Sequence, residues 1–142
     1  LQLLKENGFN EYKDVGGWIS LDAMILMHQF SSCRKDTSEQ WIYPYLDSLM
    51  LDRVYSGYYP PSSYAFNKDR SYTYLCQKDS LPQIYGHWSP LPSRKIKGGL
   101  KDVKNIDKLR SDIGLGSFYV HCIGLGIKVP EGYEIPQRYL KE

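Results

Sequence analysis

The residues of this sequence best suited to proton-transfer chemistry are its histidines, because imidazole changes charge near neutral pH. The chain holds three of them, His28, His87 and His121. His28 lies in the apolar run LDAMILMHQF and His121 in FYVHCIGLGI, so both are predicted to be structural residues. His87 differs, because in IYGHWSPL it follows a glycine and precedes a tryptophan and a proline turn. This places His87 at the end of a short strand predicted at 83–88. Catalytic groups often lie at strand ends and on the loops beside them, so His87 is the leading functional candidate.

The elements expected to position His87 are a buried helix and a facing strand. Residues 18–30 are apolar on almost every side, which is typical of a helix inside a fold, and a polar, glycine-rich turn precedes them. Cysteine hydrolases place a nucleophile at the start of such a helix, where the dipole and free backbone N–H groups lower the thiol pKa. A histidine on a facing strand then accepts the proton. The order of elements in this sequence fits that layout.

Two stretches, DVGGWISLDAMI and YTYLCQKDSLPQIYGHW, resemble the papain-like cysteine proteases of the OTU type, especially the compact enzymes of nidoviruses. In that family, a motif around the catalytic cysteine opens the central helix, and a His-Trp or His-Tyr pair follows on a strand. Trp18 matches the aromatic position of the motif, while His87 and Trp88 match the pair. The resemblance implies a protease or deubiquitinase that acts on a peptide or a ubiquitin-like protein in a host cytoplasm.

The nucleophile position of that family holds no cysteine here. One register places it on Gly16, and a papain-type register places it on Ser20, at the expected helix start. The resemblance therefore implies a silenced enzyme or a non-catalytic descendant that still binds its partner. Ser20 is also explained as an ordinary helix N-cap, a position that favours serine.

The remaining roles follow from the same resemblance. The turn from Gly16 to Ser20, including Gly17, would hold the oxyanion donors, and Trp18 and Trp88 would contact the substrate. Asp102 is the first candidate for the group that orients the imidazole of His87. Asp102 also fits a solvated or capping position before a helix.

An alternative function is suggested by the basic stretch SRKIKGGLKDVKNIDKLR. Positive side chains beside many tyrosines can bind a phosphate backbone and stack on bases. His87 and His121 would then act as general acid and base in metal-independent RNA cleavage, as in a toxin domain cut from a larger protein. A solvated helix face is the plainer explanation of such a charge run. The cations of the stretch are Arg94, Lys95, Lys97, Lys101, Lys104, Lys108 and Arg110.

A third function, a protein-interaction module such as an inhibitor or adaptor, is suggested by the tyrosine content. The chain contains 13 tyrosines, and a tyrosine combines a large apolar ring with a hydrogen-bonding tip that suits interfaces. Ordinary packing explains most of them equally well.

The expected fold class is α+β, with a central buried helix packed on an antiparallel sheet, because helical patterns precede strand-like ones. Helices are predicted at 1–7, 18–30, 44–56 and 103–113, with Pro44 starting or kinking the third. Residues 58–69 are predicted to form a loop, and residues 130–142 a tail without clear order. Strands are predicted at 71–76, 83–88 and 116–129.

Length and composition set the remaining expectations. A chain of 142 residues is predicted to form one domain, 1–142. Cys33, Cys76 and Cys122 are few and far apart, which favours free thiols in a reducing compartment such as the cytoplasm and predicts no structural zinc site. We expect no cofactor, no membrane span and no signal peptide. The net charge of +2 is too small to indicate a nucleic-acid binder by itself.

Overall fold

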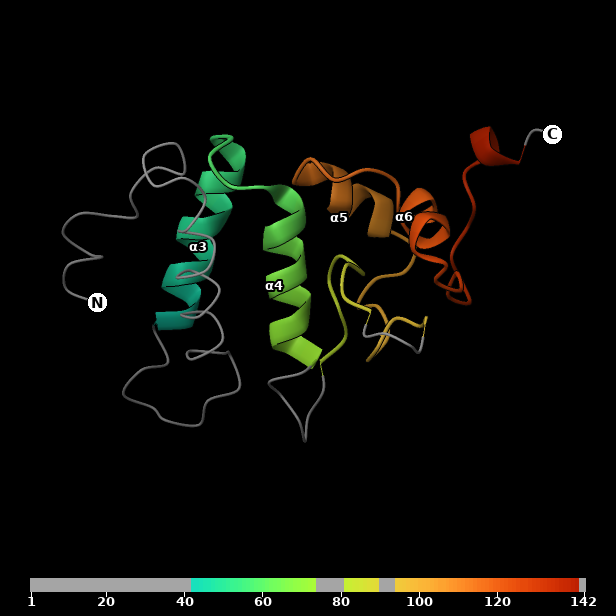
Figure 1. The fold of residues 1–142 in the computed structure, drawn as a ribbon, viewed down its shortest axis with the longest axis horizontal. Coiled ribbons are helices and arrows are strands. Elements are labelled where there is room, and N and C mark those ends of the chain that lie inside the picture. Colours follow the sequence, from blue (N-terminus) through green and yellow to red (C-terminus); the bar gives the residue numbers. More distant parts are fainter. Residues whose placement is uncertain (1–41, 74–80, 90–93, 141–142) are drawn as a thin grey trace.

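A computed structural model describes residues 42–73, 81–89 and 94–140 of the chain. These residues form four α-helices and one short 3-10 helix: α3 (Ile42–Tyr55), α4 (Pro61–Thr73), α5 (Ile106–Asp112), α6 (Phe118–Leu125) and η2 (Gln137–Tyr139). Helices α3 and α4 lie side by side, and α5 and α6 lie beyond α4, on the side away from α3 (Figure 1). The β-pairing within these described ranges is one isolated parallel bridge between Gln83 and Leu100.

The predicted α+β class is wrong for this part of the molecule, because the described residues contain helices and no strand. The predicted strand at 71–76 begins with residues that end α4, and the predicted strand at 83–88 is a loop. The strand predicted at 116–129 contains α6, where Phe118 and Cys122, four positions apart, are both fully buried. A short apolar run fits helical and strand periods alike, so its period alone could not decide between them.

Helix α4 replaces a predicted loop because its prolines occupy positions that a helix tolerates. Pro61 is the first helical residue, and the Tyr64 N–H donates to the carbonyl oxygen of Pro60 at 3.1 Å. Proline is favoured at that position, since the first N–H groups of a helix have no intrahelical partner. The dipeptide Pro60–Pro61 therefore begins a helix here instead of preventing one.

Two predicted helices are confirmed. The helix expected near 44–56 is α3, with Pro44 as its third residue, inside the first turn where proline is tolerated. The helix expected at 103–113 is the shorter α5, which begins at Ile106. The helices predicted at 1–7 and 18–30 lie outside the described residues. No helix in the described ranges is long and apolar enough to cross a bilayer.

The buried apolar side chains form two clusters, and the 81–89 segment contributes to the first. That first cluster joins α3, α4 and the residue after α5: Met50, Val54, Tyr59, Tyr64, Ala65, Tyr85 and Ile113. The second cluster packs α5 against α6: Ile106, Phe118, Cys122 and Ile127. Because Tyr85 belongs to the first cluster, the loop that carries His87 is anchored in the hydrophobic core.

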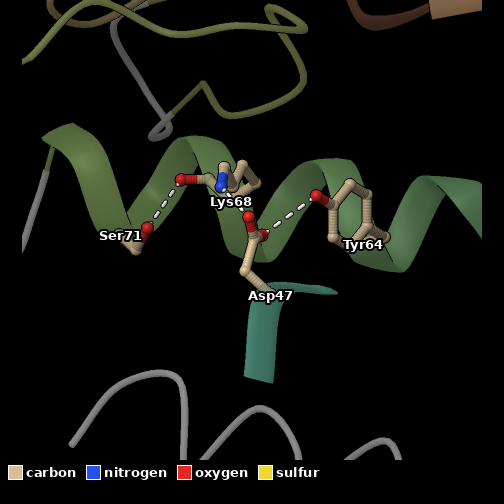
Figure 2. A network of polar contacts seen from close by, with 4 residues as sticks. All are labelled: Asp47, Tyr64, Lys68 and Ser71. Atoms are coloured by element: carbon tan, nitrogen blue, oxygen red, sulfur yellow. Dashed lines mark hydrogen bonds and ion pairs between the residues drawn. The ribbon is translucent and has the colours of Figure 1, made fainter. Parts of the chain in front are cut away.

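A polar network ties α3 to α4 at the edge of the first cluster (Figure 2). Asp47 of α3 points at α4, where the Tyr64 hydroxyl donates to its Oδ1 at 2.9 Å and Lys68 Nζ forms an ion pair with its Oδ2. The Lys68 side chain is only 8 % exposed. A charge removed from water to this extent is stabilised mainly by its partner, so Asp47 compensates a buried cation.

We expect Asp47→Asn to lower the free energy of unfolding by about 2 kcal/mol, because the neutral amide cannot balance a largely buried ammonium group. Urea denaturation of both proteins measures the difference. The matched control is Asp112→Asn, which breaks the exposed Lys108–Asp112 pair and should change stability by at most about 0.5 kcal/mol. Equal effects of the two substitutions would contradict this account of the α3–α4 contact.

Candidate functional site

The loop that carries His87 is anchored by the buried carboxylate of Asp69 on α4. Asp69 Oδ1 accepts hydrogen bonds from the backbone N–H groups of Ile84 at 2.8 Å and Tyr85 at 3.1 Å. Its Oδ2 accepts from the His87 N–H at 2.7 Å. Asp69 is 0 % exposed, and this burial raises the pKa of its carboxyl to about 6 although the three N–H groups and Arg110 act in the opposite direction. Asp69 therefore fixes the backbone of residues 84–87.

A second buried polar residue, Gln83, closes the same loop and attaches it to residues 97–101. Its Oε1 accepts from the Trp88 N–H at 3.1 Å, and its Nε2 donates to the carbonyl oxygens of Trp88 at 2.6 Å and Lys97 at 2.9 Å. Its backbone donates to Gly99 and accepts from Lys101. Since Gln83 is fully buried, these bonds satisfy polar groups that would otherwise be costly to bury.

Gly86 allows the loop to approach α6 closely. Its φ is +60°, and a Cβ at this position would lie 2.5 Å from Cε2 of Phe118. Both the left-handed backbone and the contact with the ring require a residue without a side chain. The next residue, His87, is thereby placed against α6.

The structure brings together His87 and His121, which come from the loop and from α6. Their rings are stacked, with centroids 4.5 Å apart and planes inclined by 19°. Nδ1 of His87 and Nε2 of His121 are buried and have no hydrogen-bond partner. His121 was predicted to be a structural residue of a strand, but it lies on a helix and faces the leading functional candidate.

A buried arginine lies beside this pair. Arg110 of α5 is 2 % exposed, and it donates from Nε to the carbonyl oxygen of Gly116 and from Nη1 to that of Tyr85, both at 2.8 Å. The ion pairs within the described ranges are Lys68–Asp47 and Lys108–Asp112, so Arg110 forms none there. The cluster thus combines two imidazoles with a guanidinium whose hydrogen bonds end on neutral carbonyl groups.

The electrostatics of the cluster keep both imidazoles neutral at pH 7. Burial, followed by the nearby His121 and Arg110, lowers the pKa of His87 to about 4. Burial and Arg110 lower the pKa of His121 to about 4 as well. Neighbouring Cys122 is fully buried, which raises the pKa of its thiol to about 11 and makes it an inert core residue.

The described residues contain no group of three or more His, Cys, Asp or Glu side chains arranged to hold a metal ion. Two nearby imidazoles can instead exchange protons with the same bound molecule.

Of the other predicted site residues, Trp88 and Asp102 lie in the part of the chain that the structure describes. Gly16, Gly17, Trp18 and Ser20 lie outside the described residues, so the predicted cysteine-protease activity stays a prediction. Asp102 accepts exposed hydrogen bonds from the backbone and the side chain of Asn105, just before α5. That local bonding supports a structural role for Asp102 in the turn. Trp88 is 8 % exposed, with Lys97 Nζ 5.5 Å from its ring centroid.

The sequence did not identify Asp69 or Gln83 as site residues, and it grouped Arg110 with surface cations although Arg110 is buried. Asp69 and Gln83 gave no usable signal, because the first fell in a predicted loop and the second in a predicted strand. Arg110 did give one, since it lies four residues after Ile106 and three before Ile113, on the apolar face of its helix. A cation at such a position is expected to be buried with the apolar residues.

Comparison with protein-family models, curated proteins and solved structures finds no match to this chain. The resemblance to papain-like proteases of the OTU type is therefore wrong as a guide to the fold. The described residues form helices without a strand, whereas that family requires a facing sheet.

We expect the stability of the protein to fall as the pH falls from about 6.5 to about 4. Each of the two histidines has a pKa of about 4 in the folded protein, below its ordinary value of 6.5. The neutral rings therefore stabilise the folded state above pH 6.5, and this contribution is lost as the pH falls towards 4 and the rings become protonated. Asp69 acts in the opposite sense, because its raised pKa gives stability that is present below 3.8 and lost as the pH rises through about 6. Two groups outweigh one, so the net change follows the histidines.

Urea denaturation at a series of pH values measures this dependence. The matched variant is His87→Gln/His121→Gln, which should lose less stability than the wild type over the same pH interval. If wild type and variant show the same slope, the histidines do not have depressed pKa values in the folded protein.

Proposed function

We propose that this chain cleaves RNA, with His87 and His121 as the general acid–base pair. The observation that carries the proposal is the stacking of these two imidazoles at 4.5 Å beside the buried guanidinium of Arg110. Both side chains are half-buried, so each keeps part of its surface in contact with solvent. The two histidines lie 34 positions apart in sequence, and three helices contribute to holding them together.

The reaction needs only groups that this cluster and RNA provide. One neutral imidazole accepts the proton of a ribose 2′-hydroxyl while that oxygen attacks the adjacent phosphorus. The bond from phosphorus to the 5′-oxygen breaks, and the other imidazole, in its protonated form, donates a proton to the leaving oxygen. The products are a 2′,3′-cyclic phosphate and a 5′-hydroxyl end, with one proton taken and one given. Arg110 adds positive charge near the phosphate, where the transition state is anionic.

The basic stretch supports the same proposal through long-range attraction. One of its seven cations, Arg110, is buried and donates to the carbonyl oxygen of Tyr85 in the loop that carries His87, and the others remain on the surface. Exposed cations attract a nucleic-acid backbone and make its binding depend on salt. The exposed members are Arg94, Lys95, Lys97, Lys101, Lys104 and Lys108.

A second candidate, a protein-interaction module, is favoured by one surface feature. Val120, Ile123 and Leu125 of α6 are 52 %, 60 % and 55 % exposed. Apolar side chains gathered on one short helix are a common component of protein interfaces. An interaction module would bind its partner with little dependence on salt, whereas RNA binding should weaken steeply as salt is raised.

We expect the purified chain to cleave a fluorogenic oligoribonucleotide in buffer containing EDTA, faster at pH 5.5 than at pH 7.5, because the acid form of either imidazole is scarce at neutral pH. His87→Ala and His121→Ala should each lower the rate by about 10²–10⁴-fold, the usual contribution of a general acid or base. The rate is measured from initial fluorescence changes, and the cyclic phosphate is identified by mass spectrometry.

The matched controls are a 2′-deoxy version of the oligonucleotide and the variant Ser56→Ala, at an exposed position after α3. The deoxy substrate should remain intact, and the variant should retain the wild-type rate. Cleavage that persists in both histidine variants, or no cleavage of RNA by the wild type at any pH, would refute the proposal.

A further inference from the structure

The positive charge of Arg110 is buried, and no carboxylate of the described residues forms an ion pair with it. Burial lowers the pKa of the guanidinium, while Asp107 and Asp69 favour its charged form from a distance. Both carboxylates are occupied by other donors. Asp107 accepts from the Phe118 N–H at 2.6 Å and from the Tyr133 hydroxyl at 2.7 Å, and Asp69 accepts from the loop. An uncompensated buried cation is costly, so the site favours an added negative charge.

The unpaired ring nitrogens of the two histidines also indicate an anionic ligand. Nδ1 of His87 and Nε2 of His121 are buried polar atoms without hydrogen bonds, and burial, with a smaller effect of Arg110, lowers the pKa of both rings. Unpaired buried atoms of this kind indicate a group that the protein itself does not supply. A cation does not suit a site that already contains a guanidinium, whereas an oxyanion can accept hydrogen bonds from imidazole and guanidinium together.

The charged and titratable groups around the cluster come from three helices and from the segment after α6, which contributes Tyr133. Helix α4 contributes Asp69, α5 contributes Asp107 and Arg110, and α6 contributes His121 and the buried thiol of Cys122. With both rings neutral and the two carboxylates engaged by donors, Arg110 is the charged group of this cluster without an ion-pair partner among the described residues. A bound anion would reverse the local field and make protonation of a ring more favourable.

We propose that Arg110, His87 and His121 form a binding site for a phosphate-type oxyanion, and that the site takes up a proton when the anion binds. The inference rests on the proposed function in one respect, because it identifies the scissile phosphate of RNA as the natural occupant. Anion binding and protonation strengthen each other by the same factor. The proton acquired in this way is the one that the general acid donates to the leaving oxygen.

Isothermal titration with inorganic sulfate tests the site, because sulfate does not itself change protonation between pH 5 and 8. We expect sulfate to bind at least tenfold more tightly at pH 5.5 than at pH 7.5. Titrations at pH 5.5 in two buffers of different ionisation enthalpy should show net proton uptake. His121→Gln should reduce both the uptake and the pH dependence, and Arg110→Met should abolish binding if circular dichroism shows that it folds. Lys128→Gln, an exposed cation outside the cluster, should behave as the wild type.

Competition by a 2′-deoxy oligonucleotide distinguishes a backbone phosphate from a free anion as the occupant. Displacement of sulfate by the oligonucleotide supports the RNA phosphate, and its absence restricts the site to small anions. Sulfate affinity that is independent of pH, or reduced as much by Lys128→Gln as by His121→Gln, overturns the inference. Sulfate binding with proton uptake but no RNA cleavage leaves this site standing and refutes the proposed function. RNA cleavage without such binding supports the proposed function and refutes the anion site.

Discussion

Asp69 sits on α4 with no exposure to water, and its two carboxylate oxygens accept hydrogen bonds from three backbone N–H groups of the 84–87 loop. Backbone donors must find partners when they are buried, and no helix or sheet supplies them in this loop. A single side chain performs that task. The position of His87, the packing of Tyr85 in the first cluster and the close approach at Gly86 all depend on it.

The same arrangement explains why charge is distributed unevenly around the histidines. Asp69 uses its oxygens on the loop and Asp107 uses its oxygens at the start of α6, so neither forms an ion pair with Arg110. The fold therefore retains a buried cation beside two neutral imidazoles, an arrangement that lowers stability. Features of this kind often mark functional sites, because the groups that destabilise the free protein are stabilised by the bound ligand.

The sequence allowed some of this to be predicted, and the limits have physical causes. Helices α3 and α5 followed from apolar spacing, and His87 was identified from its place after a glycine. His121 was assigned to a strand because its apolar surroundings fit both periods, and only packing against α5 selects the helix. The pairing of the two histidines depends on the bonds of Asp69 and on the space at Gly86, where a Cβ would lie 2.5 Å from Cε2 of Phe118. Such tertiary contacts leave no local pattern in a single sequence.

The central claim is that His87 and His121 form one stacked pair in which burial and Arg110 lower both pKa values. Nuclear magnetic resonance of the imidazole Cε1–H signals, followed from pH 8 to pH 3.5, measures it directly. The account predicts cross-relaxation between the two rings and a pKa of about 4 for each. Two histidines that titrate independently near 6.5, without cross-relaxation between their rings, would contradict it.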